Sequence, residues 1–326
     1  MKNQEPTAVP FEAVYLKHLV STEKPFEMAS NPALFFESRT HSEALASLGS
    51  FLEHKGGLAL IYGQEGAGKT LVCKRFLENI DKNRFDILFM AEPTNEPVSF
   101  LWEIARYFDV PLTSQSSASE MVEELVDTLR SPRERWPVLA IDCAERLSDD
   151  ALDFLEELYS GGETHEPVGS LLVILFGREE LVTRLLDRRM RPIRRHIVMT
   201  HYLQPLTVEE TAAYIRHRLL KAGSHGFLRF DEEVVKVLHA ESKGSPAMIN
   251  SLCERCLELL HEQSKTVVDG QVLHHVLAKG EGDFLPGATS RFPSRLKLYI
   301  AGGLAIVAVI VLLCLLFLHY RHALGL

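Results

Sequence analysis

Cysteine is scarce in this 326-residue sequence, which has five in total. Cys253 and Cys256 form a C-x-x-C pair, but no second pair or histidine cluster stands at the spacing of a zinc site. The composition excludes a disulfide-stabilised miniprotein, and it favours core packing of these thiols in a reducing compartment over a redox or metal role. The first ten residues lack the apolar core of a signal peptide.

An excess of basic residues is also missing. The formal net charge is −9, and 35 Lys and Arg stand against 44 Asp and Glu. This balance argues against nucleic acid as the main partner. Hydrophobic residues make up 46% of the chain, so it can bury the core of one large or two ordinary domains.

Long apolar runs are absent except for one near the end, Leu298–Leu318, which has 21 residues and no charge. As a helix it is about 31 Å long, enough to cross a bilayer. Three cationic residues precede it and Arg321 alone follows, so we expect residues 1–297 on the cytoplasmic side and residues 319–326 on the other. A buried core helix is the alternative, but such helices rarely lack a polar face. Residues 280–297, rich in Gly, Pro and Ser, are predicted to be a flexible linker.

Short apolar runs alternate with helical patterns in residues 51–206. This alternation predicts a parallel sheet covered by helices on both faces, a doubly wound α/β domain. The predicted strands are Leu58–Tyr62, Phe85–Met90, Val138–Ile141, Leu171–Phe176 and Ile197–Leu203, and the predicted helices are Leu71–Ile80, Val98–Tyr107, Met121–Leu129, Ala151–Leu158 and Glu179–Leu186.

Residues 207–279 show helical signals only. Thr207 and Glu210 form a capping box, Asp231 begins a second helix, and Gly244 ends it before Ser245-Pro246 opens a third. A last helix is expected from about residue 269 to 277. We therefore predict a small all-helical domain, preceded by the α/β domain and by an N-terminal segment over residues 1–50.

A phosphate-binding motif, G-x-x-x-x-G-K-[ST], follows the first predicted strand and opens a helix. Its backbone N–H groups and the helix N-terminus suit a β-phosphate, Lys69 would reach the β- and γ-phosphates, and Thr70 would hold Mg²⁺ together with Asp142. The cofactors predicted are ATP and Mg²⁺; an empty, vestigial loop is the alternative. The predicted nucleotide-binding residues are Gly63, Gln64, Glu65, Gly66, Ala67, Gly68, Lys69, Thr70 and Leu71.

A catalytic glutamate is missing from the position where many P-loop ATPases have one. Asp142 ends the third strand, but Cys143 follows it, and a neutral thiol is a poor base. Glu145 lies two positions further on. It is either a displaced base or the N-terminal charge of the next helix, and the second interpretation is preferred.

From Tyr15 to Ala278 the sequence resembles the AAA+ ATPases of the general secretion pathway protein A type. The segments YLKHLVSTEKPFEMASNPALFFESRTHSEALASL and PLTVEETAAYIRHRLLKAG carry this resemblance. It implies a RecA-like AAA+ core with a helical lid, ATP at a subunit interface, ring-like homo-oligomers, and work on envelope or secretion machinery at the inner membrane. Members often carry a periplasmic domain after the membrane helix. Here eight residues follow, so we expect the helix mainly to localise the protein.

Three departures from the family pattern lie on the γ-phosphate side. Cys143 replaces the catalytic Glu, Arg178 replaces a neutral sensing amide, and Ala247 replaces the lid arginine. The resemblance implies an ATPase, but these changes predict ATP binding with slow or no hydrolysis. Asp142, Glu145 and Arg178 are the catalytic candidates in the chain.

Six arginines fall within residues 184–195, and three interpretations stay open. By the resemblance, Arg191 and Arg194 would contact the nucleotide of a neighbouring subunit. Nucleic-acid binding is less favoured, because no aromatic residues are interleaved with the arginines. The third interpretation is a solvated face paired with local acids. Phe35, Phe36 and His41 match family positions near the adenine, although core packing is the commoner role for such residues.

The preferred function is that of an inner-membrane-anchored AAA+ ATP-binding protein, weak or inactive in hydrolysis. It would act as a nucleotide-dependent assembly factor for an envelope, secretion or pilus system. The alternatives are a non-catalytic membrane scaffold and a DNA-associated regulatory ATPase.

Overall fold

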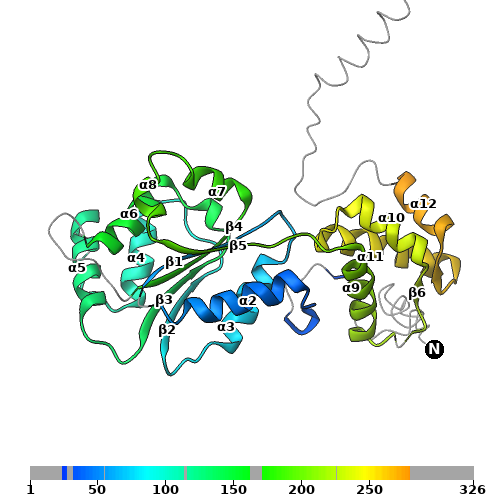
Figure 1. Ribbon diagram of the computed structural model, residues 1–326, viewed down its shortest axis with the longest axis horizontal. Coiled ribbons are helices and arrows are strands. Elements are labelled where there is room, and N and C mark those ends of the chain that lie inside the picture. The colour runs from blue at the N-terminus through cyan, green and yellow to red at the C-terminus, as the bar shows by residue number, and fades with distance from the viewer. Residues whose placement is uncertain are drawn as a thin grey trace, which may run out of the picture. The chain divides into compact units, whose positions relative to one another are not determined.

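A five-stranded parallel sheet forms the centre of residues 32–206 in the computed structural model of the protein (Figure 1). The structure describes residues 24–27, 32–54, 56–113, 116–161, 171–224 and 226–279. The strand order is β2-β3-β4-β1-β5. The strands are β1 Gly57–Tyr62, β2 Phe85–Met90, β3 Trp136–Ile141, β4 Leu172–Gly177 and β5 Ile197–Tyr202.

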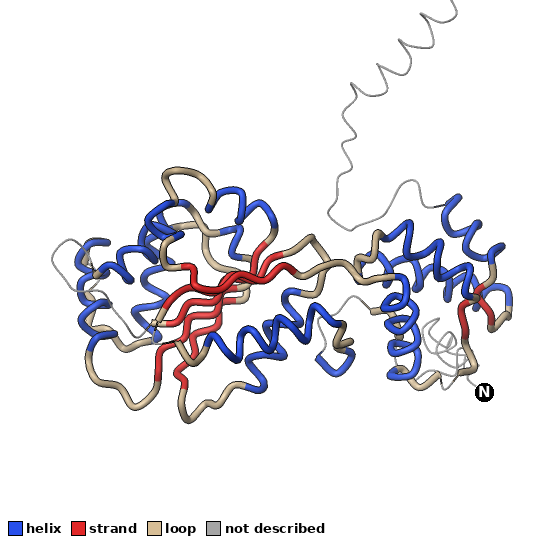
Figure 2. The backbone as a smooth tube through the Cα atoms, in the orientation of Figure 1, coloured by secondary structure: helices blue, strands red, loops and turns tan. Residues whose placement is uncertain are grey.

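Helices cover both faces of this sheet, as predicted (Figure 2). Helices α2 and α3 share one hydrophobic cluster with strand residues such as Ile61 and Ile174. On the other face α4 to α8 pack against Leu60 and Val173. The central strands are buried on both faces because they carry almost only apolar residues. The helices are α2 Arg39–Phe51, α3 Lys69–Asn79, α4 Pro97–Tyr107, α5 Ala118–Arg130, α6 Asp149–Ser160, α7 Glu179–Leu185 and α8 Arg191–Arg194, with short 3₁₀ helices at Pro32–Leu34 and Ala144–Arg146.

The sequence did not predict helix α8. It is one turn long, has Pro192 as its second residue, and has three charged or proline positions among its four residues. Its one buried side chain is that of Ile193, which joins the core. A single apolar residue leaves no periodic signal, and packing therefore determines this turn.

The lid, residues 207–279, contains four helices and, contrary to the all-helical prediction, one pair of short strands. Strands β6 Arg229–Phe230 and β7 Val267–Val268 pair in parallel over two residues each, too few for an alternating pattern. The thiols of Cys253 and Cys256 are free and buried in the lid core, where burial raises their pKa. This agrees with core packing. The helices are α9 Val208–Lys221, α10 Glu232–Ser242, α11 Pro246–Gln263 and α12 Gly270–Lys279.

The capping box predicted at the start of the lid is confirmed. Thr207 Oγ1 accepts a hydrogen bond from the backbone N–H of Glu210 at 3.2 Å, and the Glu210 carboxylate accepts one from the N–H of Thr207 at 3.0 Å. The same carboxylate also accepts a bond from the backbone N–H of Arg39 in α2. The start of α9 is thereby connected to the first helix of the core.

Gly244 holds the lid against the loop that leads into it from β5, and its replacement should be strongly destabilising. Its φ is +71°, and a Cβ there would lie 2.2 Å from the Leu206 carbonyl oxygen. We expect Gly244→Ala to lower the free energy of unfolding by at least about 2 kcal/mol. Gly270→Ala is the matched control, because no heavy atom lies within 4 Å of its added Cβ. Equal unfolding midpoints for the two variants in thermal denaturation would contradict this prediction.

The predicted linker, membrane helix and tail, residues 280–326, lie outside the described residues, as does nearly half of the N-terminal segment, residues 1–23. Within the described part of the chain, no helix has the length and apolar character needed to cross a membrane.

Candidate functional site

The phosphate loop connects β1 to α3 at the carboxyl end of the sheet, as the motif predicts. Lys69 bends back over the loop, and its Nζ donates hydrogen bonds to the carbonyl oxygens of Gly63 at 2.9 Å and Gln64 at 2.8 Å. Burial lowers the pKa of this ammonium group. A partly desolvated cation whose hydrogen bonds to the described residues go to neutral carbonyls is suited to exchange them for phosphate oxygens.

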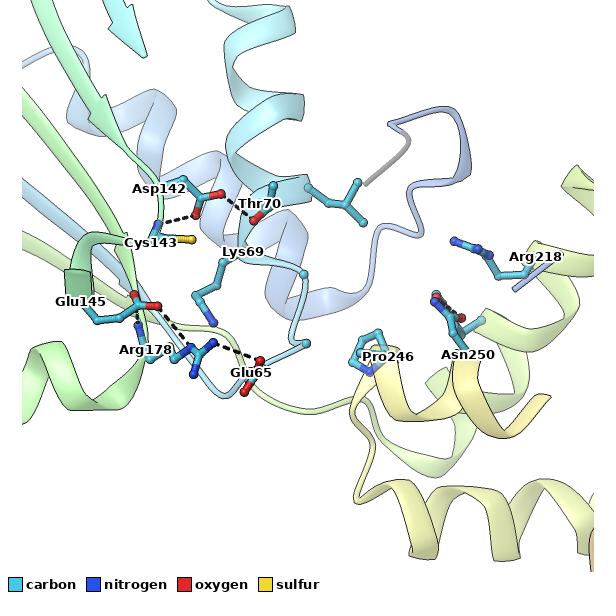
Figure 3. Close-up of a pocket in the computed structure, with 15 residues that line it drawn as sticks. Glu65, Lys69, Thr70, Asp142, Cys143, Glu145, Arg178, Arg218, Pro246 and Asn250 are labelled. Atoms are coloured by element: carbon cyan, nitrogen blue, oxygen red, sulfur yellow. Dashed lines mark hydrogen bonds and ion pairs between the residues drawn. The ribbon is translucent and has the colours of Figure 1, made fainter. Parts of the chain in front are cut away.

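Thr70 and Asp142 meet next to this loop, from elements 72 positions apart. Thr70 Oγ1 donates a hydrogen bond of 2.6 Å to Asp142 Oδ2, and the N–H of Cys143 donates one of 3.0 Å to Oδ1 (Figure 3). Burial raises the pKa of Asp142. A hydroxyl and a desolvated carboxylate fit Mg²⁺ when phosphate oxygens and water supply its other ligands. Among the described residues, no group of three His, Cys, Asp or Glu forms a metal site independent of such a ligand.

A chain of ion pairs that the sequence did not reveal joins the phosphate loop to the residues after β3. Arg178 Nε lies 3.2 Å from Glu145 Oε1, and an Arg178 Nη lies 3.0 Å from Glu65 Oε1 of the phosphate loop (Figure 3). The backbone N–H of Arg178 also donates to Glu145 Oε2 at 3.1 Å. Both carboxylate oxygens of Glu145 therefore have partners, and Arg178 joins the loop to the residues after β3.

Cys143 lies beside Asp142 with a positive φ of 51°. Its side chain is half-buried at the cavity, and burial raises the pKa of the thiol. The thiol is therefore protonated at neutral pH, as expected for a group that cannot serve as the base.

A cavity of about 250 Å³ lies between the phosphate loop and the lid. Gly66 touches the start of α11, because its carbonyl oxygen accepts a hydrogen bond of 3.3 Å from the N–H of Ala247. A Cβ at Gly66 would lie 2.4 Å from the Cβ of Ala247, so the glycine permits this approach. The cavity is lined by Glu65, Gly66, Gly68, Lys69, Thr70, Leu71, Asp142, Cys143, Glu145, Arg178, Tyr214, Arg218, Pro246, Ala247 and Asn250. Of the predicted loop residues, Gly63, Gln64 and Ala67 are not in this lining; their carbonyls hold Lys69 and His41 instead.

Sequence reasoning missed Arg218, an arginine of the lid that lines the cavity. It is 2% exposed, and its guanidinium donates hydrogen bonds to the carbonyl oxygens of Pro25 at 2.6 Å and Glu27 at 2.8 Å. In Figure 3 it lies on the lid side of the cavity, near Asn250. The lid thus keeps one cation at the site, although Ala247 occupies the expected arginine position.

Phe35, Phe36 and His41 lie together beside the loop. The ring of Phe35 meets His41 edge to face, and Phe36 meets Tyr214 of α9 in the same way. These three residues line a narrow cavity of about 20 Å³ that shares Gly68 and Leu71 with the larger cavity. They therefore pack in the protein interior and also border the site.

The buried imidazole of His41 contacts the backbone of the phosphate loop. Its Nε2 is 3.0 Å from the carbonyl oxygen of Ala67, and its Nδ1 is bonded to the Ser38 hydroxyl. These contacts require an Nε2–H tautomer that donates to Ala67 and accepts from Ser38. Burial lowers the pKa of His41 below its ordinary value of 6.5.

Replacing His41 should change how stability depends on pH. Below pH 6.5 the unfolded chain binds a proton that the folded chain resists, so the contribution of His41 falls as the pH falls. We expect the wild type to exceed His41→Gln by about 1 kcal/mol in unfolding free energy above pH 7, and the difference to shrink towards pH 5. Chemical denaturation at several pH values measures this, with His54→Gln as the control. A difference that stays constant with pH would contradict the prediction.

The arginine cluster is mostly engaged within the chain. Arg184 pairs with Asp149 at 2.7 Å, and Arg189 pairs with Asp149, Asp150 and Asp153 of α6. Arg194 donates to the carbonyl oxygens of Leu185 and Leu186 and so holds the end of α7.

Arg191, by contrast, is exposed, and its guanidinium has no hydrogen-bond or ion-pair partner among the described residues, although its backbone N–H donates to the carbonyl oxygen of Arg188. Neither Arg191 nor Arg194 lies in the cavity of its own chain. The structure therefore leaves Arg191 as the available candidate for contact with a neighbouring subunit.

Comparisons with known proteins show which family and which proteins this chain is similar to. Residues 52–185 match the family described as AAA domain. The chain is 29% identical over 246 residues to general secretion pathway protein A of Aeromonas hydrophila, which confirms the resemblance found in the sequence. The aligned part covers 75% of this chain and 44% of that protein, so the chain spans less than half the length of this relative.

Solved structures share the fold at low sequence identity. Drosophila ORC bound to DNA has a TM-score of 0.60 and 17% identity, over 86% of this chain and 70% of that one. The Aeropyrum pernix ORC2 protein in ADPNP-ADP complexes has a TM-score of 0.56 and 16% identity, over 79% and 71%. Cdc6p from Pyrobaculum aerophilum has a TM-score of 0.55 and 17% identity, over 78% and 70%. Residues 32–279 thus have the P-loop fold of an AAA+ ATPase.

Proposed function

We propose that this AAA+ protein binds ATP with Mg²⁺, hydrolyses it slowly or not at all, and uses the bound nucleotide to control assembly at a membrane. The observation that carries this proposal is an asymmetry within one cavity. The groups suited to the β-phosphate and Mg²⁺ are assembled, whereas the positions that would act on the γ-phosphate are changed or occupied. Such a site suits a long-lived bound state.

Three side chains, those of Lys69, Thr70 and Asp142, would bind the phosphates and Mg²⁺. Lys69 would leave two loop carbonyls for phosphate oxygens, and Thr70 and Asp142 are already adjacent and oriented for Mg²⁺. The metal would neutralise phosphate charge. Arg218 and the ring edges of Phe35 and Phe36 would lie beside the part of the nucleotide beyond its phosphates.

On the side of the site that would act on the γ-phosphate, the described residues offer no base without a partner. Cys143 keeps its proton at neutral pH, and both oxygens of Glu145 already accept bonds from Arg178. Glu145 would orient and activate a water molecule better if the Arg178 guanidinium moved towards a γ-phosphate and gave up its ion pair with Glu145. That exchange couples the cation that stabilises the phosphate to the carboxylate that activates water, and it supports slow hydrolysis rather than none.

The membrane and its machinery complete the proposal. The apolar run Leu298–Leu318 would anchor the protein in the inner membrane, with the nucleotide site on the cytoplasmic side, where ATP is available. The relative named general secretion pathway protein A supports a role in an envelope, secretion or pilus system. Ring-like homo-oligomers would place Arg191 of one subunit at the nucleotide of the next.

The two alternatives differ in their support. A non-catalytic scaffold would use the same fold without needing nucleotide. DNA association is less well supported, because intrachain acids or carbonyls engage Arg184, Arg189 and Arg194. The surface charge available for phosphate contacts is reduced accordingly.

Assembly in response to nucleotide tests the proposal. We expect the full chain in detergent micelles to shift to a larger species in light-scattering gel filtration with ATP and Mg²⁺, but not with ADP. Arg191→Ala should weaken the shift, whereas Arg106→Ala, an exposed arginine at the end of α4, should not. A single size under all conditions would contradict an assembly switch and favour the scaffold.

A further inference from the structure

A second cavity lies in the lid, away from the nucleotide site. It has a volume of about 470 Å³ and lies between α9, α10 and β6. Charged side chains, among them Arg216 and Lys236, stand at its rim. We call it the lid groove. Its apolar lining comprises Val208, Ala212, Ile215, Leu219, Leu228 and Val235.

The N-terminal part of the chain is fixed at the edge of this groove. Phe26 is 1% exposed, and its ring meets that of Phe230 edge to face at 6.1 Å. Phe230 also lines the lid groove. The hydrogen bonds from Arg218 to the carbonyl oxygens of Pro25 and Glu27 hold the same segment against α9. Residues 25–27 therefore lie next to the groove.

Residues 11–20, FEAVYLKHLV, have the pattern of a segment that would fill an apolar groove. Phe11, Val14, Tyr15 and Leu19 recur at i, i+3, i+4 and i+8, which places them on one face of a helix, and Lys17 falls outside that stripe. Position 20 lies six positions before Phe26, a separation that can span at most roughly 20 Å. The apolar face is thus within reach of the lid groove.

We propose that residues 11–20 of the same chain dock as a helix in the lid groove, with their apolar face against α9 and α10. Such docking would bury the apolar side chains of both the groove and the segment. It would also fix the N-terminal segment to the lid, beyond the contacts at Phe26 and Arg218. This docking does not require nucleotide hydrolysis.

Hydrogen exchange of the full chain in detergent micelles tests this docking. We expect the amides of residues 11–20 to exchange at least about tenfold more slowly than in an isolated peptide of residues 1–23. Ala212→Trp, which fills the groove, should abolish the protection. Ala240→Trp, at an exposed position on α10 outside the groove, should preserve it.

A second variant keeps the test decisive if Ala212→Trp fails to fold. The double substitution Tyr15→Ser/Leu19→Ser leaves the groove itself unchanged, and it should remove the protection without changing the exchange of β1 and β4. Fast exchange in the wild type would overturn the proposal, as would protection that survives both the groove variant and the segment variant. Crosslinks between isotopically distinct chains, in which the segment of one reaches the groove of another, would also overturn it.

Discussion

Cys143→Glu should raise ATP turnover by about 10²- to 10⁴-fold, the usual contribution of a positioned general base. Cys143 directly follows Asp142 at the carboxyl end of β3, and its side chain lines the nucleotide cavity. A carboxylate there would accept the proton that the thiol, its pKa raised by burial, cannot accept. It would also relieve Glu145, which is bound to Arg178, of any catalytic task.

The measurement is phosphate release at saturating ATP and Mg²⁺ by the full chain in micelles. Cys143→Gln is the matched control, because glutamine has nearly the same size as glutamate but cannot act as a base. It should leave turnover near the wild-type rate. Rapid turnover by the wild type, or an equal rise in both variants, would refute the assignment of Cys143 to the vacated base position.

Lys69→Ala should weaken ATP binding by about 3 kcal/mol, or roughly 100-fold, because a charge-assisted bond to phosphate is lost. The ammonium group is desolvated at the loop, and only two carbonyl oxygens accept its hydrogen bonds. Alanine provides neither the positive charge nor the donors. The same variant should fail to assemble in response to ATP, if bound nucleotide drives assembly.

Equilibrium binding of a fluorescent ATP analogue measures this loss directly. Lys82→Ala, an exposed lysine in the turn between α3 and β2, is the control and should bind as the wild type does. Unchanged affinity of Lys69→Ala, with normal thermal unfolding, would show that nucleotide binds elsewhere or not through this loop.

Local patterns in the sequence were enough to predict the sheet, most helices and the phosphate loop. The strand cores were placed to within two residues, because fully buried parallel strands need uninterrupted apolar runs. The capping box at Thr207 could be predicted because its donors and acceptors lie within four residues of one another. Lys69, Thr70 and Asp142 could be assigned because the backbone geometry of the loop requires a fixed spacing.

Which charged groups of the site already have partners depends on contacts between residues that are far apart in the sequence. Arg178 reaches Glu145, 33 residues away, and Glu65, 113 residues away, and nothing in the local sequence specifies either pairing. Arg218 enters the site because the N-terminal residues Pro25 and Glu27 offer it carbonyl oxygens from the far end of the chain. The sequence alone therefore identified the P-loop, and it predicted that the usual base is missing. Folding brings Arg178 to two carboxylates and Arg218 to two carbonyl oxygens, and such long-range contacts decide which charges remain available for nucleotide and for a neighbouring subunit.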